Sequence, residues 1–259
     1  MRITAESTLG EIAVECPTAM KVLDRYQIDY SCGGSHTLRQ ACEAMGVPVD
    51  EIIYAAVALE NREGEGSDED PSDWTRESLQ VLTRYIAEKH HTFLKNELTR
   101  LSQIVERLCD DEGSRFPQLH DLRRLFVVMR NELLPHMLKE EQVLFPYISL
   151  MEDALSGRKP MPMPPFGSVQ NPIRAMLPEH DTSTELFHEM RRVTRDFEIP
   201  EGASVRYLAL VRDLEGLELD LHRHLHLENN VLFPRAVQME KRAAENAELE
   251  FYGTTLGNC

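Results

Sequence analysis

Apolar residues recur every three or four positions through most of the chain after residue 78, which is the spacing of one buried face of an α-helix. This periodicity predicts four long helices over residues 78–109, 119–144, 178–196 and 204–232, with a further helical tail after Pro234. The proline-rich stretch Arg158–Pro172 interrupts the pattern, because proline lacks a backbone donor and obstructs the turn before it. Four helices with one long connection in the middle predict an all-α fold, an antiparallel four-helix bundle.

A smaller helical pattern precedes the bundle. Residues 8–25 predict a helical stretch interrupted at Pro17, and residues 37–45 and 49–61 predict two more short helices. The turn Asp29–Gly34 lies between them and ends in two glycines, which give the backbone unusual freedom. We therefore expect a small helical domain over residues 1–60, an acidic linker over 61–74, the bundle over 75–245 and a C-terminal tail over 246–259.

Composition excludes several classes of function. The 259 residues carry a net charge of −16, which argues against binding to nucleic acid or to an anionic membrane surface. No apolar run approaches the roughly 20 residues that a transmembrane helix needs, and the N-terminus does not resemble a secretory signal. The five cysteines are scattered and form no C-x-x-C pair, so we expect a protein of the reducing cytoplasm.

One pattern, H-x-x-x-E-x-x-V-L-F-P, occurs twice, from His136 to Pro146 and from His224 to Pro234. Histidine and glutamate four residues apart lie on the same face of a helix, one turn from each other. Both pairs stand among leucines, and buried imidazoles and carboxylates are costly without a partner. Two such helices facing each other would therefore present a ligand set for a pair of metal ions.

Alignment of the two copies selects the carboxylates. Glu140 aligns with Glu228, whereas Glu141 aligns with Asn229, so Glu140 is the expected ligand. His222 and His226 align with leucines and are expected to be neighbours of the site at most. His120 and His188 are interpreted as ordinary surface or hydrogen-bonded histidines.

A histidine on the preceding helix completes each half of the bundle. His180 precedes His224 by 44 residues, and His91 precedes His136 by 45. His90 is the alternative to His91, because it shares a side with Ile86 and other apolar residues, but the half-repeat spacing favours His91. The predicted ligands are His91, His136, Glu140, His180, His224 and Glu228.

This donor set favours iron, with manganese second. Structural zinc prefers closed tetrahedral sites and often thiolates, while calcium and magnesium prefer oxygen ligands alone. Imidazoles mixed with carboxylates are typical of iron. The cofactor expected is therefore two non-heme iron ions bridged by Glu140 and Glu228. Open positions would take an oxo or hydroxo bridge in the oxidised state, or a small ligand such as O2 or NO.

The chain resembles the repair-of-iron-centres di-iron proteins, and its bundle resembles the hemerythrin-like domain. That family combines a short N-terminal domain bearing D-Y-C-C-G-G with a bundle bearing H-M-x-K-E-E-x-x-L-F-P and H-x-x-L-E-N-N-V-L-F-P. The matching segments here are Asp29–Gly34, His136–Pro146 and His224–Pro234, and Glu179–Asp181 matches the family's third helix.

The resemblance implies repair of iron–sulfur clusters damaged by nitric oxide or oxidants, through labile iron in the di-iron site. It implies damaged iron–sulfur proteins as clients and places the metal ligands on the same six residues. Alternative functions are a di-iron nitric oxide reductase, or a reversible O2 or NO sensor or carrier. Dimerisation through the small N-terminal domain is a further expectation.

The chain departs from the family at one point, since Ser31 stands where the family commonly has the first of two adjacent cysteines. Chemistry that needs a vicinal dithiol is therefore not expected. Cys32 remains the candidate thiol, which could bind metal transiently, accept NO or form a mixed disulfide. The alternative is a small residue buried beside a Gly-Gly turn.

Overall fold

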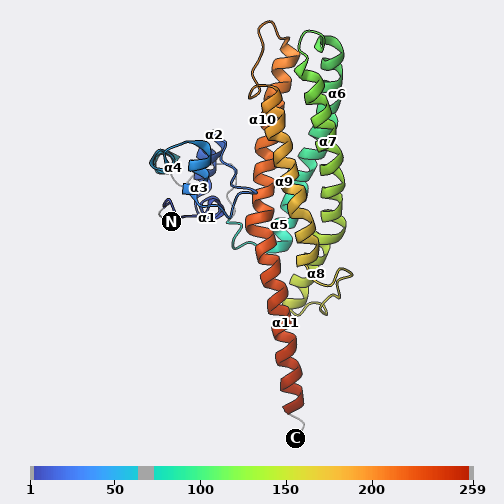
Figure 1. Ribbon diagram of the computed structural model, residues 1–259. Helices are drawn as coiled ribbons and strands as arrows, with labels where there is room; N and C mark the ends of the chain where they lie inside the picture. Colours follow the sequence, from blue (N-terminus) through green and yellow to red (C-terminus); the bar gives the residue numbers. More distant parts are fainter. Residues whose placement is uncertain (1–2, 64–72, 257–259) are drawn as a thin grey trace.

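The computed structural model describes residues 3–63 and 73–256, with side chains described for residues 3–61 and 73–245. Within these residues the chain is helical and contains no strand, only an isolated bridge between Thr8 and Thr37. Figure 1 shows a long upright bundle, a small domain against one side of it, and a C-terminal helix that projects past the bundle's end. None of the described helices is both long and apolar enough to span a membrane.

Four helical paths build the bundle, as the sequence predicted. The first path consists of α5 (Leu79–Tyr85), η1 (Ile86–His91) and α6 (Thr92–Glu112). The second consists of α7 (Gln118–Lys139), η2 (Glu140–Leu144) and α8 (Phe145–Leu155). The third path is α9 (Gln170–Val193) alone. The fourth consists of α10 (Val205–His226), η3 (Leu227–Leu232) and α11 (Phe233–Leu256). The predicted boundary at residue 245 lies within α11, so the tail continues the fourth path up to Leu256.

Three of the paths are not the uninterrupted α-helices that the periodicity predicted, because η1, η2 and η3 are π-helical turns. The repeated V-L-F-P accounts for two of them. Pro146 and Pro234 lie in the first turn of the helix that follows η2 and η3, and proline cannot donate the i→i−4 bond that would close the preceding turn as an α-helix.

The third path also differs from the prediction. Helix α9 begins at Gln170, so the end of the stretch expected to be non-helical is helical. Pro172 is tolerated because the N–H groups of a first turn have no intrahelical partner. The helix ends at Val193 instead of Asp196, and residues 195–197 all have positive φ, between 53° and 62°.

Two apolar layers fill the bundle, one above and one below a polar middle. One layer runs from Leu94 to Leu225 and includes Phe126 and Leu214; the other runs from Leu79 to Met239 and includes Leu144 and Leu232. The residues between these layers are the buried histidines and glutamates of the predicted site. The apolar layers therefore hold the four paths in register on either side of the site.

The N-terminal domain has its own apolar core and four helices: α1 (Leu9–Glu15), α2 (Pro17–Arg25), α3 (Leu38–Met45) and α4 (Val49–Glu63). Pro17 opens α2, which agrees with the predicted interruption. Thr8 and Thr37 each close a capping box that begins α1 and α3. Most of the predicted acidic linker, residues 64–72, lies outside the described residues.

We expect Phe126→Ala to lower the free energy of unfolding by about 3–5 kcal/mol, because the Phe126 ring is fully buried in the apolar layer that runs from Leu94 to Leu225 and its removal leaves a cavity. Urea denaturation of the metal-free protein measures this. Val127→Ala is the matched control, since this neighbour is 39% exposed, and it should change the value by less than about 0.5 kcal/mol. Equal effects of the two substitutions would contradict the packing described.

Candidate metal centre

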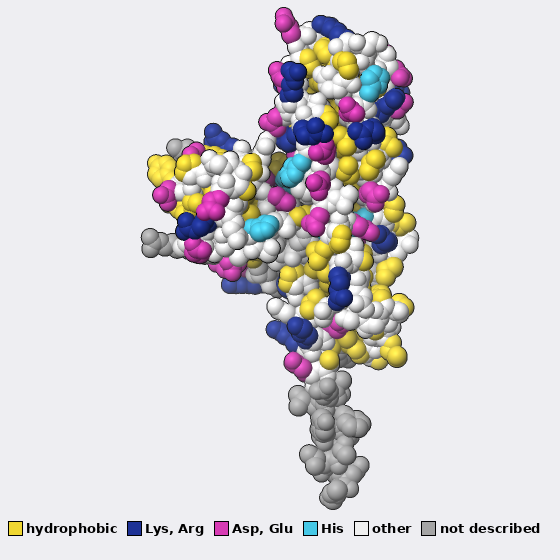
Figure 2. Space-filling view, viewed as in Figure 1, with side chains coloured by type: hydrophobic (Ala, Val, Ile, Leu, Met, Phe, Trp, Pro, Cys, Tyr) yellow, Lys and Arg dark blue, Asp and Glu magenta, His cyan; other side chains and the backbone are white. Residues whose placement is uncertain are grey.

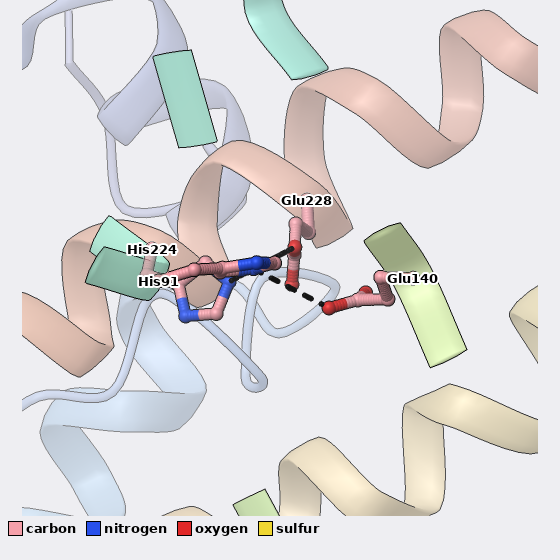
Figure 3. A group of neighbouring side chains, drawn as sticks. All are labelled: His91, Glu140, His224 and Glu228. Atoms are coloured by element: carbon pink, nitrogen blue, oxygen red, sulfur yellow. Dashed lines mark hydrogen bonds and ion pairs between the residues drawn. The ribbon is translucent and has the colours of Figure 1, made fainter. Parts of the chain in front are cut away.

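The structure brings all six predicted residues together between the two apolar layers. His91 comes from η1, His136 and Glu140 from the α7–η2 junction, His180 from α9, and His224 and Glu228 from the α10–η3 junction. Each is 0–1% exposed. Figure 3 shows His91, His224 and Glu228 converging on Glu140, which reaches them from another path.

These side chains form two groups that share both carboxylates. One group is His91, His224, Glu140 and Glu228, and the other is His136, His180, Glu140 and Glu228. Within each group the candidate ligand atoms lie within 4.8 Å of one another. This is the arrangement of a dimetal site in which two glutamates can bridge two ions and each ion has two histidines of its own.

Distances within the groups fit metal coordination. The Nε2 atoms of His91 and His224 are 3.1 Å apart, and those of His136 and His180 are 2.9 Å apart. One carboxylate oxygen of Glu140, Oε2, lies 3.3 Å from Nε2 of His136 and 3.5 Å from Nε2 of His91. Metal–ligand bonds of about 2.1 Å place neighbouring corners of an octahedron about 3.0 Å apart, so the donors lie close to coordinating positions.

The electrostatics of the site also favour a bound cation. Neither oxygen of Glu140 accepts a hydrogen bond from the described residues, and Oε2 of Glu228 accepts none either. Burial and the neighbouring Glu228 raise the pKa of Glu140 well above its usual value, and burial lowers the pKa of His136 and His224 to about 4. Burying an unpaired carboxylate costs several kcal/mol, which bound cations would offset.

Each copy of the repeated motif also positions the histidine of the helix before it. Phe145 stacks on His91 at 5.6 Å, and Phe233 stacks on His180 at 5.8 Å. The Phe of V-L-F-P is therefore part of the site, a role that sequence reasoning missed. Its occurrence at the same place in both copies was the signal that could have revealed it.

The residue that follows each motif glutamate contacts the same histidine from its other nitrogen. Nδ1 of His91 lies 2.9 Å from Glu141, whose carboxylate also pairs with Lys95. Nδ1 of His180 lies 2.8 Å from Oδ1 of Asn229. Such partners fix ring orientation and tautomer in metal sites. Glu141 and Asn229 therefore support the candidate ligands without belonging to either group.

The remaining pair of histidines differs between the halves. Nδ1 of His136 lies 2.7 Å from Glu179, which Lys139 also contacts. Nδ1 of His224 has no hydrogen-bond partner among the described residues. The His90 ring stacks on the His224 ring, with 5.9 Å between the ring centroids. Each group thus contains one histidine backed by a carboxylate.

The other histidines stay outside both groups. His90 is buried but turns its Nδ1 to Asp220 at 3.0 Å, whereas His91 reaches the shared carboxylates. His226 contacts Asn230 and the Tyr30 ring, and His222 lies near Tyr30 as well. Of the two histidines predicted to be ordinary, His120 contacts the thiol of Cys109 and His188 is exposed.

Cys32 lies against the bundle, not inside the metal groups. Its Sγ is 3.5 Å from Oγ1 of Thr184 and 3.8 Å from Nδ2 of Asn229. Burial, with Asp29 nearby, raises the pKa of the thiol to about 12, so it stays protonated at neutral pH in this conformation. Ser31 is buried and donates its hydroxyl to Asp29, so it shapes the turn.

Comparison with known proteins agrees with this geometry. Residues 83–236 match the model of the hemerythrin HHE cation binding domain. Residues 5–59 match ScdA_N, which is described as a domain of unknown function. Similar proteins include those named iron-sulfur cluster repair protein YtfE in Yersinia pseudotuberculosis serotype IB (strain PB1/+) and Yersinia pestis (strain Pestoides F). Each is 31% identical over 234 residues, which cover 90% of this chain and 97% of the relative.

The fold and the two shared-carboxylate groups define a hemerythrin-type protein with a dimetal site. Because the relatives align over nearly their whole length and both domains match, the chain belongs to the repair-of-iron-centres family of hemerythrin-like proteins.

We expect Glu140→Gln to abolish binding of both metal ions, because the two groups share this carboxylate. The metal-free variant should also melt at a higher temperature than the metal-free wild type, since a neutral amide replaces a buried carboxylate that lacks hydrogen bonds. Metal analysis and calorimetry measure the two effects. Glu141→Ala is the control, and it should weaken binding only about 10–100-fold. A Glu140→Gln protein that still holds two ions would contradict the shared site.

Proposed function

We propose that the six buried residues bind two non-heme iron ions and that the chain supplies this iron to repair iron–sulfur clusters damaged by nitric oxide or oxidants. The observation that carries the proposal is the pair of His2Glu2 groups that share Glu140 and Glu228. The name of the relatives, iron-sulfur cluster repair protein, supports the same role. The clients would be damaged iron–sulfur proteins.

The donor set supports iron over zinc. The described cysteines lie outside both groups. Each group offers two imidazoles and two carboxylates, which are ligands of hard and intermediate character and suit iron first and manganese second. The bound ions would neutralise Glu140 and Glu228 and would bind unprotonated imidazoles, a state that the lowered pKa values of His136 and His224 favour. Iron is both the resident metal and the cargo in this proposal.

Access to the site supports exchange of its contents. A groove of about 410 Å³ lies beside η1, η2 and α8, and Glu141 and Phe145 line it. Both residues contact His91 directly. One candidate ligand is therefore only one side chain away from solvent, so iron or a small molecule has a short path to the site.

The compartment and the oligomeric state complete the proposal. Cys16, Cys32, Cys42 and Cys109 are free thiols, which accords with a reducing cytoplasm. Acidic side chains and a histidine lie on the bundle face beside the N-terminal domain (Figure 2), a surface that suits cations better than anionic polymers. A homodimer through the N-terminal domain stays a prediction.

A second candidate, reduction of nitric oxide, is favoured by the coordination number. Each group offers four donor residues, two of them shared, and a six-coordinate iron would have positions left for NO or O2. Formation of N2O over many turnovers by the protein supplied with an excess of reductant would establish this activity. Stoichiometric NO binding without N2O would reject it and would leave a sensor or carrier role.

Iron transfer tests the main proposal. We expect protein purified without oxygen to contain two irons per chain, in line with its two groups, and to reconstitute an apo iron–sulfur protein. His136→Ala should abolish the transfer because it removes a nitrogen donor from one group. The exposed His188→Ala is the matched control and should transfer iron like the wild type. Equal transfer by His136→Ala and the wild type, or a zinc-only wild type, would overturn the proposal.

A further inference from the structure

Asn229 joins the metal centre to the N-terminal domain through the two ends of one amide. Its Oδ1 lies 2.8 Å from Nδ1 of His180, and its Nδ2 donates to the carbonyl oxygen of Ser31 at 3.0 Å. The same Nδ2 lies 3.8 Å from Sγ of Cys32. A candidate ligand and the Ser31–Gly34 turn are therefore separated by a single side chain.

The equivalent position in the other half of the bundle lacks this connection. There Glu141 contacts His91 and pairs with Lys95, and all three belong to the bundle. The two halves thus differ in what orients the first-helix histidine. A carboxylate held within the bundle orients His91, whereas a neutral amide held by another domain orients His180.

The turn fits closely against η3. Asn230, next to Asn229, donates to the carbonyl oxygen of Tyr30 at 3.0 Å. A Cβ on Gly34 would lie 2.3 Å from Oδ1 of Asn230, and one on Gly10 would lie 2.8 Å from it. A side chain at Gly34 would therefore displace either the Asn230 amide or the turn, so the close packing of the turn against η3 relies on glycine at this position.

We infer that Asn229 is a positioning residue that makes the affinity of the His136–His180 metal position depend on docking of the N-terminal domain. With the domain docked, the Ser31 carbonyl fixes the amide so that its oxygen accepts from His180. With the domain released, the amide is free to rotate, and His180 loses its partner. Partners of this kind commonly change metal affinity about 10–100-fold.

The coupling must be reciprocal. If docking raises the affinity of this position by some factor, then metal binding favours docking by the same factor. Iron would therefore hold the domain closed over Cys32, and release of the domain would loosen one of the two ions. This inference rests on the proposed function only in taking the metal to be iron.

Three substitutions separate the roles of the amide in the full-length protein. Asn229→Ala removes both the acceptor and the donor. Asn229→Asp keeps an acceptor for His180, like Glu141 in the other half, but cannot donate to Ser31. Gly34→Ala leaves Asn229 intact and pushes the turn away from Asn230. Ser35→Ala, at an exposed neighbouring position, is the control for the turn.

Each variant is characterised by two measurements. The first is the time course of iron release to a ferrous chelator, and the second is the rate at which iodoacetamide alkylates Cys32, measured by peptide mass spectrometry. In Asn229→Ala and Gly34→Ala one of the two irons should leave about 10–100-fold faster, and Cys32 should react faster. Asn229→Asp should expose Cys32 equally but keep both irons at the wild-type rate. Iron loading of the wild type should slow alkylation of Cys32.

Wild-type iron release from Asn229→Ala, or accelerated release from Asn229→Asp, would overturn the inference. So would a Cys32 reactivity in the wild type that does not change on iron loading. These outcomes would leave the di-iron proposal standing as long as the wild type holds two irons. A wild type that binds no iron would overturn both.

Discussion

Two buried carboxylates that are largely without hydrogen-bond partners are the constraint on which the rest of the structure depends. Glu140 and Glu228 are fully buried between two apolar layers, and three of their four oxygens accept no hydrogen bond from the described residues. An apolar core normally excludes such groups. Their retention, with four imidazole nitrogens around them, fits a bundle that holds cations, and bound cations would stabilise the folded chain.

The duplicated motif meets this constraint because its eleven residues include both candidate ligands and the side chains that orient a further ligand. Each copy supplies a histidine and a shared glutamate, and its next residue and its phenylalanine then orient the histidine of the preceding helix. The proline that ends each copy opens the turn before it into a π-helix. Ligands and their supports therefore lie close together in sequence, and the fold needs only to bring two similar hairpins face to face.

The two halves are similar but not equivalent, and one difference lies in a single pair of aligned residues. Glu141 ties His91 to the bundle, whereas Asn229 ties His180 to the N-terminal domain. The same turn holds Cys32 in a buried setting that raises its pKa to about 12 and makes the thiol a poor nucleophile while the domain is docked. The contact between the turn and the bundle thus sets the surroundings of the thiol and supplies the partner of the Asn229 amide.

The sequence by itself determined the helical class, the four paths and five of the six residues that the structure brings together, and it favoured His91 over His90 as the sixth, because helix period and an internal repeat are local properties. It also separated Glu140 from Glu141, since only Glu140 has a counterpart in the second copy. It failed at η1, η2 and η3, where backbone hydrogen bonding departs from the α-helical period, and at the start of α9, where a proline stands in a first turn that needs no backbone donor. Only the tertiary structure decided that His91 enters the site while His90 bonds to Asp220, and that Asn229 reaches Ser31 almost two hundred residues away. Both facts depend on contacts between helices, and no spacing along one chain segment encodes which side chain meets a partner from another.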